Sequence, residues 1–103
     1  MNLPVVLTRT AEQQLWSATD WYAARDPELG ERWFRGIHEA IKSLAENPER
    51  FGLAHENDDL PVGLREMLYG VGRRKSHRVL FIIRDDRIVV HQVRHVSQRD
   101  FLG

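Results

Sequence analysis

The stretch from His77 to Val96 reads HRVLFIIRDDRIVVHQVRHV and places arginines and histidines at intervals inside two apolar runs. A guanidinium can hold a phosphate or a carboxylate through two parallel hydrogen bonds, and an imidazole, with an ordinary pKa of about 6.5, can transfer a proton near neutral pH. Asp85 and Asp86 separate the two runs, which is typical of a two-residue hairpin loop. Such a loop would determine which residues lie opposite one another.

With Asp85 and Asp86 in the loop, Leu80 is predicted opposite His91 and Arg78 opposite Val93, and opposed residues share a face of the sheet. One face is then apolar and suits packing against helices, with Val79, Phe81, Ile83, Ile88 and Val90. The other face would carry Arg78, Leu80, Ile82, Val89, His91, Val93 and His95. Arg78 and His95 become diagonal neighbours, about 7 to 8 Å apart, and could hold one anion together.

The preceding strand offers a second arginine. Alternate residues of this strand, Arg65, Met67 and Tyr69, are predicted on the face that carries Arg78, which the helices leave open. Arg65 would then lie beside Arg78. Instead of binding a partner, Arg78 could form an ion pair with a carboxylate of the N-terminal half. His91 could likewise have a structural role instead of a binding role. The turn Arg73-Arg74-Lys75 could be merely solvated, or it could strengthen a salt-sensitive contact with phosphate or an acidic protein.

The elements that must position these groups follow from the apolar spacing. A strand is expected at Leu3–Leu7, and a helix at Thr10–Arg25 with Thr10 and Gln13 as a capping box. A second helix starts with Asp26 as cap and Pro27 in its first turn, and stops at Asn47-Pro48. Residues 48–63 form a loop, and strands follow at 63–69, 78–84 and 87–94. The expected fold is α+β with the order β-α-α-β-β-β, an antiparallel-rich sheet with the two-helix hairpin packed on one face, in a single domain over residues 1–103.

Composition narrows the classes of function. The net charge of zero divides into −5 over residues 1–61 and +5 over residues 62–103, and thirteen of the fifteen basic residues are arginine. A negatively charged partner for the C-terminal half, or mutual neutralisation of the halves within the fold, would explain this division. The absence of cysteine excludes disulfides, zinc-thiolate sites and thiol nucleophiles, and no metal or cofactor is expected. No apolar run approaches a membrane span and the first residues lack a signal-peptide pattern, so we expect a cytoplasmic protein without membrane contact.

Several segments together resemble the RelE/ParE superfamily of toxins from type II toxin–antitoxin systems. They are the helical hairpin ending in NPERFG, the strand GLREMLY, the hairpin HRVLFIIRDDRIVVHQVRHV and the closing SQRDF. The resemblance spans nearly the whole chain and implies helices packed on one side of a sheet. It also implies a cognate antitoxin, whose helical and extended segment wraps around the toxin, and which binds operator DNA on behalf of the pair.

The resemblance leaves two targets open. RelE-like members cleave mRNA on the ribosome, and Arg65, Arg78 and His95 match positions that such a nuclease would use. The tyrosine that those nucleases place near the C-terminus has no counterpart in RHVSQRDFLG. The spacing from His95 to Arg99-Asp100 instead resembles ParE-like members, the plasmid-stabilisation branch, which inhibit growth by binding DNA gyrase. We favour this branch, and for a protein that acts by binding gyrase we expect no catalytic residues. The predicted target- or antitoxin-binding residues are Arg65, Arg73, Arg74, Lys75, Arg78, His91, Arg94, His95 and Arg99.

Overall fold

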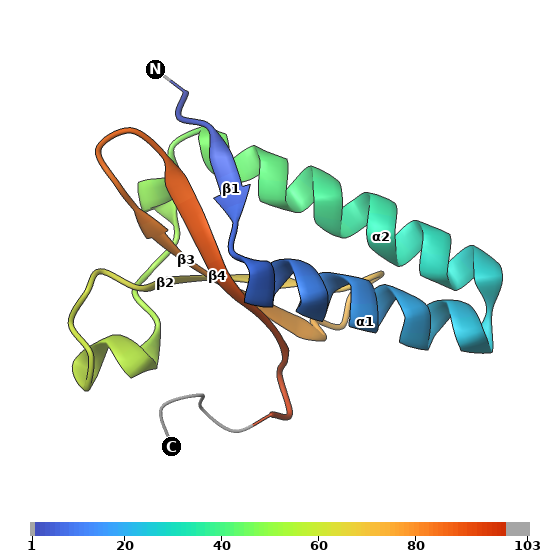
Figure 1. Cartoon of the computed structure of the whole chain (residues 1–103). Coiled ribbons are helices and arrows are strands. Elements are labelled where there is room, and N and C mark those ends of the chain that lie inside the picture. Colours follow the sequence, from blue (N-terminus) through green and yellow to red (C-terminus); the bar gives the residue numbers. More distant parts are fainter. Residues whose placement is uncertain (1, 99–103) are drawn as a thin grey trace.

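The structure is a computed structural model that describes residues 2–98. Strand β1 (Val5–Leu7) leads into helices α1 (Arg9–Arg25) and α2 (Pro27–Lys42), and strands β2 (Arg65–Tyr69), β3 (His77–Ile83) and β4 (Ile88–His95) follow. Short 3-10 helices η1 (Ser43–Ala45), η2 (Pro48–Arg50) and η3 (His55–Asp58) connect α2 to β2. The strands form one sheet in the order β1-β4-β3-β2, and the helix pair covers one side of it (Figure 1). The predicted α+β order is confirmed.

The helical hairpin turns at a single residue. Asp26 donates its backbone N–H to the Tyr22 carbonyl at 2.9 Å, which closes α1, and its carboxylate accepts the Glu28 N–H at 3.0 Å, which caps α2. The predicted cap of α2 is therefore confirmed. The predicted capping box at Thr10 is wrong, because Thr8 caps α1 by accepting the Ala11 N–H at 3.1 Å.

The sheet is mixed. β1 pairs with β4 in parallel over residues 88–90, whereas β2–β3 and β3–β4 are antiparallel. The hairpin loop at Asp85-Asp86 gives the predicted register from Ile83 opposite Ile88 to Phe81 opposite Val90. Beyond this point β4 contains one extra residue, His91, in a β-bulge, so that Leu80 lies opposite Gln92 and Arg78 opposite Arg94. An extra residue reverses which side chains share a face in the rest of the strand.

This bulge overturns part of the predicted face assignment. Val79, Phe81, Ile83, Ile88 and Val90 face the helices as predicted, and they contribute to the main core with Trp33 and Ile37 of α2. Val93 was predicted on the open face but joins this core. Met67 and Tyr69 were also predicted on the open face, but they face the helices because β2 pairs with β3 so that Met67 lies opposite Val79. Met67 is buried, and the Tyr69 hydroxyl donates to the Trp33 carbonyl at 3.1 Å.

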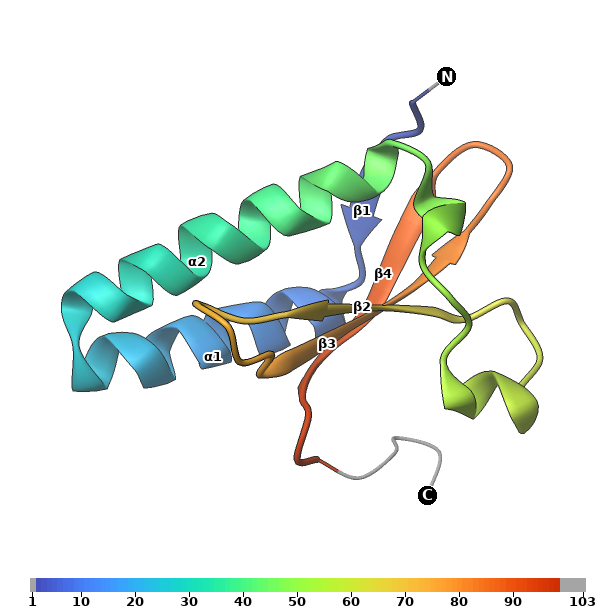
Figure 2. The same ribbon diagram turned by 180° about the vertical axis from the view of Figure 1, so that it is seen from behind.

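A second, smaller core lies on the opposite side of the sheet. Ala54 and Leu64 of the segment between α2 and β2 cover Leu80 and Ile82 of β3. The η3 turn hangs from this segment on the side away from the helices (Figure 2). The face that was expected to be open is therefore partly occupied by the protein's own loop. Among residues 2–98, no helix has the length and apolar character needed to cross a bilayer.

We predict that Gly30→Ala destabilises the fold, because α1 and α2 approach closely at this residue. A β-carbon at Gly30 would lie 2.6 Å from the Ala23 β-carbon and 2.7 Å from its α-carbon. Backbone must move to accept it, and overpacking of this kind costs about 1 to 3 kcal/mol of unfolding free energy. Chemical denaturation measures the change. Gly52→Ala is the control, since nothing lies within 4 Å of its β-carbon, and equal stability of both variants would contradict the prediction.

Candidate functional site

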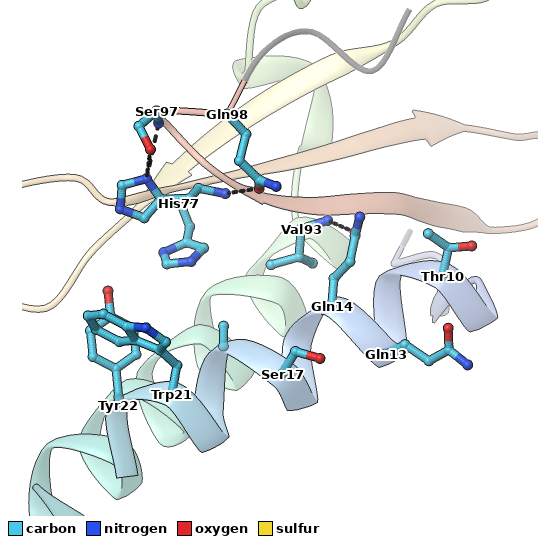
Figure 3. A pocket seen from close by; sticks show the side chains of 12 residues that line it. Thr10, Gln13, Gln14, Ser17, Trp21, Tyr22, His77, Val93, Ser97 and Gln98 are labelled. Atoms are coloured by element: carbon cyan, nitrogen blue, oxygen red, sulfur yellow. Dashed lines mark hydrogen bonds between the residues drawn. The ribbon is translucent and has the colours of Figure 1, made fainter. Parts of the chain in front are cut away.

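A groove of about 650 Å³ lies between α1 and the C-terminal part of β4 (Figure 3). We call it the α1–β4 groove. Its lining comes from one side of α1, from the ends of β3 and β4, and from the turn after β4. The lining residues are Thr10, Gln13, Gln14, Ser17, Ala18, Trp21, Tyr22, His77, Val93, His95, Ser97 and Gln98. None of them is Asp, Glu, Lys or Arg, so amides, hydroxyls, aromatic rings and imidazoles determine what can bind.

Two histidines lie side by side at one end of the groove. His77 and His95 are opposed on β3 and β4, with ring centroids 5.2 Å apart. His77 is 5% exposed and packs edge-on against Trp33, at 4.9 Å between centroids. Burial, followed by the nearby His95, lowers the pKa of His77 to about 4. His77 is therefore neutral at physiological pH and unsuited to proton transfer there.

His95 is exposed and is held by the turn that follows it. Its Nδ1 accepts the Ser97 backbone N–H at 3.0 Å and lies 2.7 Å from the Ser97 hydroxyl. Since Nδ1 accepts a hydrogen bond from an N–H group, the neutral ring carries its proton on Nε2. This geometry orients the imidazole as a hydrogen-bonding side chain at the rim of the groove.

Arg78 lies on the opposite side of the sheet in a buried ion-pair network. Its two terminal nitrogens donate to the Glu56 carboxylate of η3 at 2.8 and 2.7 Å, and its Nε donates to Glu66 of β2. The Glu56 side chain is fully buried, and its hydrogen bonds to Arg78 lower its pKa to about 2. Both carboxylates raise the pKa of Arg78. The alternative interpretation, in which a carboxylate of the N-terminal half pairs with Arg78, is confirmed.

The predicted proximity of Arg65, Arg78 and His95 is wrong. Arg78 and His95 point to opposite sides of the sheet because the bulge at His91 pairs His95 with His77. Arg65 lies opposite Phe81 on the helix side, and its guanidinium donates to the Phe51 carbonyl at 2.6 Å. Arg65 therefore does not lie beside Arg78 on an open face, and the structure does not bring together the trio that a nuclease would need.

The other predicted binding residues are dispersed. Arg73, Arg74 and Lys75 are exposed on the turn between β2 and β3. His91 is partly buried at the bulge, where burial, with the nearby Arg84, lowers its pKa. Arg94 is partly buried opposite Arg78, and Arg99 lies outside the described residues. Their roles in binding stay predictions.

Sequence reasoning missed the groove, including His77, Gln14 and Trp21. His77 precedes Val79 and Phe81 at the two-residue spacing of the apolar face, so a strand begun one residue earlier would have placed it among core residues. The α1 residues gave no comparable signal, because polar side chains at exposed helical positions are ordinary. Among the described residues, no group of three or more His, Asp or Glu side chains could hold a metal ion.

We predict that stability falls as the pH drops from about 6.5 to 4, because His77 titrates near its ordinary pKa when unfolded but at about 4 when folded. The unfolded chain then binds more protons, and the loss between pH 7.5 and pH 5 is about 2 kcal/mol. Denaturation at both pH values measures this. His77→Phe should reduce the difference, whereas His38→Gln, at an exposed histidine of α2, should retain it. An unchanged pH dependence in His77→Phe would refute the assignment.

We predict that Glu56→Gln lowers the unfolding free energy by about 2 to 3 kcal/mol, because it leaves Arg78 buried with weaker partners. The matched control is Glu31→Gln, which breaks the exposed pair with Arg35 and should cost about 0.5 kcal/mol or less. Urea denaturation at pH 7 compares the two variants. Equal losses would contradict a stabilising role for the buried pair.

The family model described as ParE toxin of type II toxin–antitoxin system, parDE, matches residues 5–100. A chain of the chromosomal ParDE toxin–antitoxin system from P. aeruginosa superposes with a TM-score of 0.72 at 21% identity, over 92% of this chain and 97% of that chain. A chain of the toxin–antitoxin complex RelBE2 from Mycobacterium tuberculosis superposes with a TM-score of 0.60 at 23% identity, over 95% of each chain. No curated protein matches the sequence.

The two structural similarities establish the shared fold, and the family model covers nearly all of the sequence, including both helices and all four strands. The chain therefore belongs to the ParE toxin family of type II toxin–antitoxin systems.

Proposed function

We propose that the protein inhibits DNA gyrase by binding it, without catalysing a reaction, and that a cognate antitoxin neutralises it. One observation supports binding over chemistry. The groups that an mRNA nuclease would require together are separated, with Arg78 neutralised by two carboxylates on one side of the sheet and His95 on the other. The buried His77 beside His95 has its pKa lowered to about 4 and does not supply a replacement base or acid.

The antitoxin is proposed from membership of a family whose description places the toxin in a two-component system. Gyrase works on chromosomal DNA, so we expect the toxin to act in the cytoplasm. The exposed turn Arg73-Arg74-Lys75 is the proposed contact with an acidic surface of the target. It presents three adjacent positive charges, and such charges steer and strengthen association in a salt-sensitive way.

The test assays purified protein in parallel on gyrase supercoiling and on mRNA in translating ribosomes. We expect loss of supercoiling with intact mRNA. Cleaved mRNA with normal supercoiling would replace the proposal with the ribonuclease alternative, and inactivity in both assays would refute it. Growth arrest on expression, and its relief by the product of the adjacent gene, tests the antitoxin.

We predict that Arg73→Gln/Arg74→Gln weakens gyrase inhibition about five- to thirtyfold, since each lost charge contact is worth about 0.5 to 1 kcal/mol at an exposed interface. The charge-matched control is Arg84→Gln/Arg87→Gln, at the exposed turn on the other end of β3. Inhibition curves at 50 and 200 mM salt should differ less for the first variant than for the original protein. Equal inhibition by both double variants would remove the turn from the proposed contact.

A further inference from the structure

Two tryptophans of α1 are about equally exposed but differ in what covers their rings. Trp21 is 52% exposed, and the guanidinium carbon of Arg25 lies over its ring, 3.3 Å from the centroid. Trp16 is 51% exposed, and no cation of residues 2–98 lies over it. The face of an indole ring is electronegative and attracts cations. Trp16 therefore offers a ring surface for such a contact without an internal cation to occupy it.

The difference follows from the sequence of α1. Residues four apart on a helix are neighbours on its surface, so the residue at i+4 can reach the ring. For Trp21 this residue is Arg25. For Trp16 it is Asp20, and Glu12 lies four residues before Trp16. Glu12 and Asp20 are exposed, and neither forms an ion pair within residues 2–98. Two carboxylates therefore flank the uncovered tryptophan.

Helix α2 holds the Trp16 ring from one side. Phe34 stacks on it with ring centroids 5.0 Å apart and 29° between the ring planes, and His38 packs on Phe34 at 5.0 Å. This contact orders the indole before a partner arrives, which lowers the entropic cost of binding. Because Phe34 covers one face and about half of the Trp16 residue stays exposed, the other face is available to a partner.

We propose that Trp16, Glu12 and Asp20 bind an arginine or lysine side chain of gyrase. The cation lies on the open face of Trp16, and the two carboxylates flank it. Charge complementarity determines the kind of partner, since an acidic side chain here would meet two like charges. An enzyme that acts on DNA needs lysines and arginines to hold the phosphates, so its surface offers such cations. This inference rests on the proposed function, because it assumes that gyrase is the target.

The contact on α1 is opposite in sign to the one proposed for the turn Arg73-Arg74-Lys75. The turn would meet an acidic part of the target, and the site around Trp16 would meet a basic part. Such a division agrees with the charge of the chain, which is −5 over residues 1–61 and +5 over residues 62–103. The two contacts involve different elements, so substitutions test them separately.

Substitutions of Trp16 distinguish a bound cation from an apolar contact. Trp16→Leu keeps apolar surface but removes the aromatic face, and it should weaken gyrase binding about five- to thirtyfold. Trp16→Phe keeps an aromatic face and should weaken binding only about two- to fourfold. Equal losses in the two variants would indicate an apolar contact and would overturn the inference.

Substitutions of the carboxylates test the charge. Glu12→Gln/Asp20→Asn should weaken gyrase binding about three- to tenfold at 50 mM salt and less at 200 mM, because salt screens exposed charges. The charge-matched control is Glu46→Gln/Glu49→Gln, which removes two exposed carboxylates after α2 and should bind within about twofold of the original. Equal binding by the two double variants would contradict the inference.

The experiment measures binding of the full chain to purified gyrase holoenzyme by calorimetry, together with inhibition of supercoiling. Chemical denaturation of each variant reports its folding, and the carboxylate variant carries the test if Trp16→Leu does not fold. Full affinity in the folded Trp16 and carboxylate variants would overturn this inference and leave the proposed function intact. Weaker binding of the antitoxin encoded beside the gene, with unchanged gyrase binding, would assign the surface to the antitoxin and also overturn it. Failure of the original protein to bind and inhibit gyrase would instead count against the proposed function.

Discussion

The extra residue in β4 is the constraint on which the rest of the site depends. Side chains of a strand alternate between two faces, so one inserted residue at His91 exchanges the faces for everything that follows it. Val93 thereby enters the main core, and His95 comes to lie against His77 on the helix side. The same insertion directs the Val93 and His95 N–H groups away from β3, toward the groove beside α1. Without the bulge the two histidines would not form one wall of that groove.

The second determinant is the charge division of the chain. The acidic N-terminal portion and the basic C-terminal portion meet at Glu56 and Arg78, which pair inside the protein and fasten the η3 segment to the sheet. This pair is one contact of the kind expected if the two halves neutralise one another within the fold. It removes Arg78 from the surface, and it leaves Arg73, Arg74 and Lys75 as an exposed basic group at the other end of the molecule from the β3–β4 loop.

These two features support our proposal that the protein acts by binding its target and not by catalysis. Catalysis by proton transfer needs a titrating group held within reach of a reacting atom, together with charges that stabilise the transition state. Here the buried His77 has its pKa lowered to about 4, and the exposed His95 is hydrogen-bonded to Ser97. The buried Arg78 donates hydrogen bonds to two carboxylates, those of Glu56 and Glu66. The α1–β4 groove, by contrast, offers space and aromatic surface, and its lining contains no Asp, Glu, Lys or Arg.

The sequence by itself determined the order of elements, the cap of α2 at Asp26 and the apolar face from Val79 to Val90, because these depend on local spacing and on the short Asp85-Asp86 loop. It also carried the family resemblance that the family model supports. Only the tertiary structure decided the bulge, the burial of Arg78 and the groove. A bulge depends on which residues the sheet and α1 can accommodate together, and an ion pair such as Glu56–Arg78 joins residues 22 positions apart. Neither leaves a periodic signal in the chain, since both result from packing between elements that local spacing does not specify.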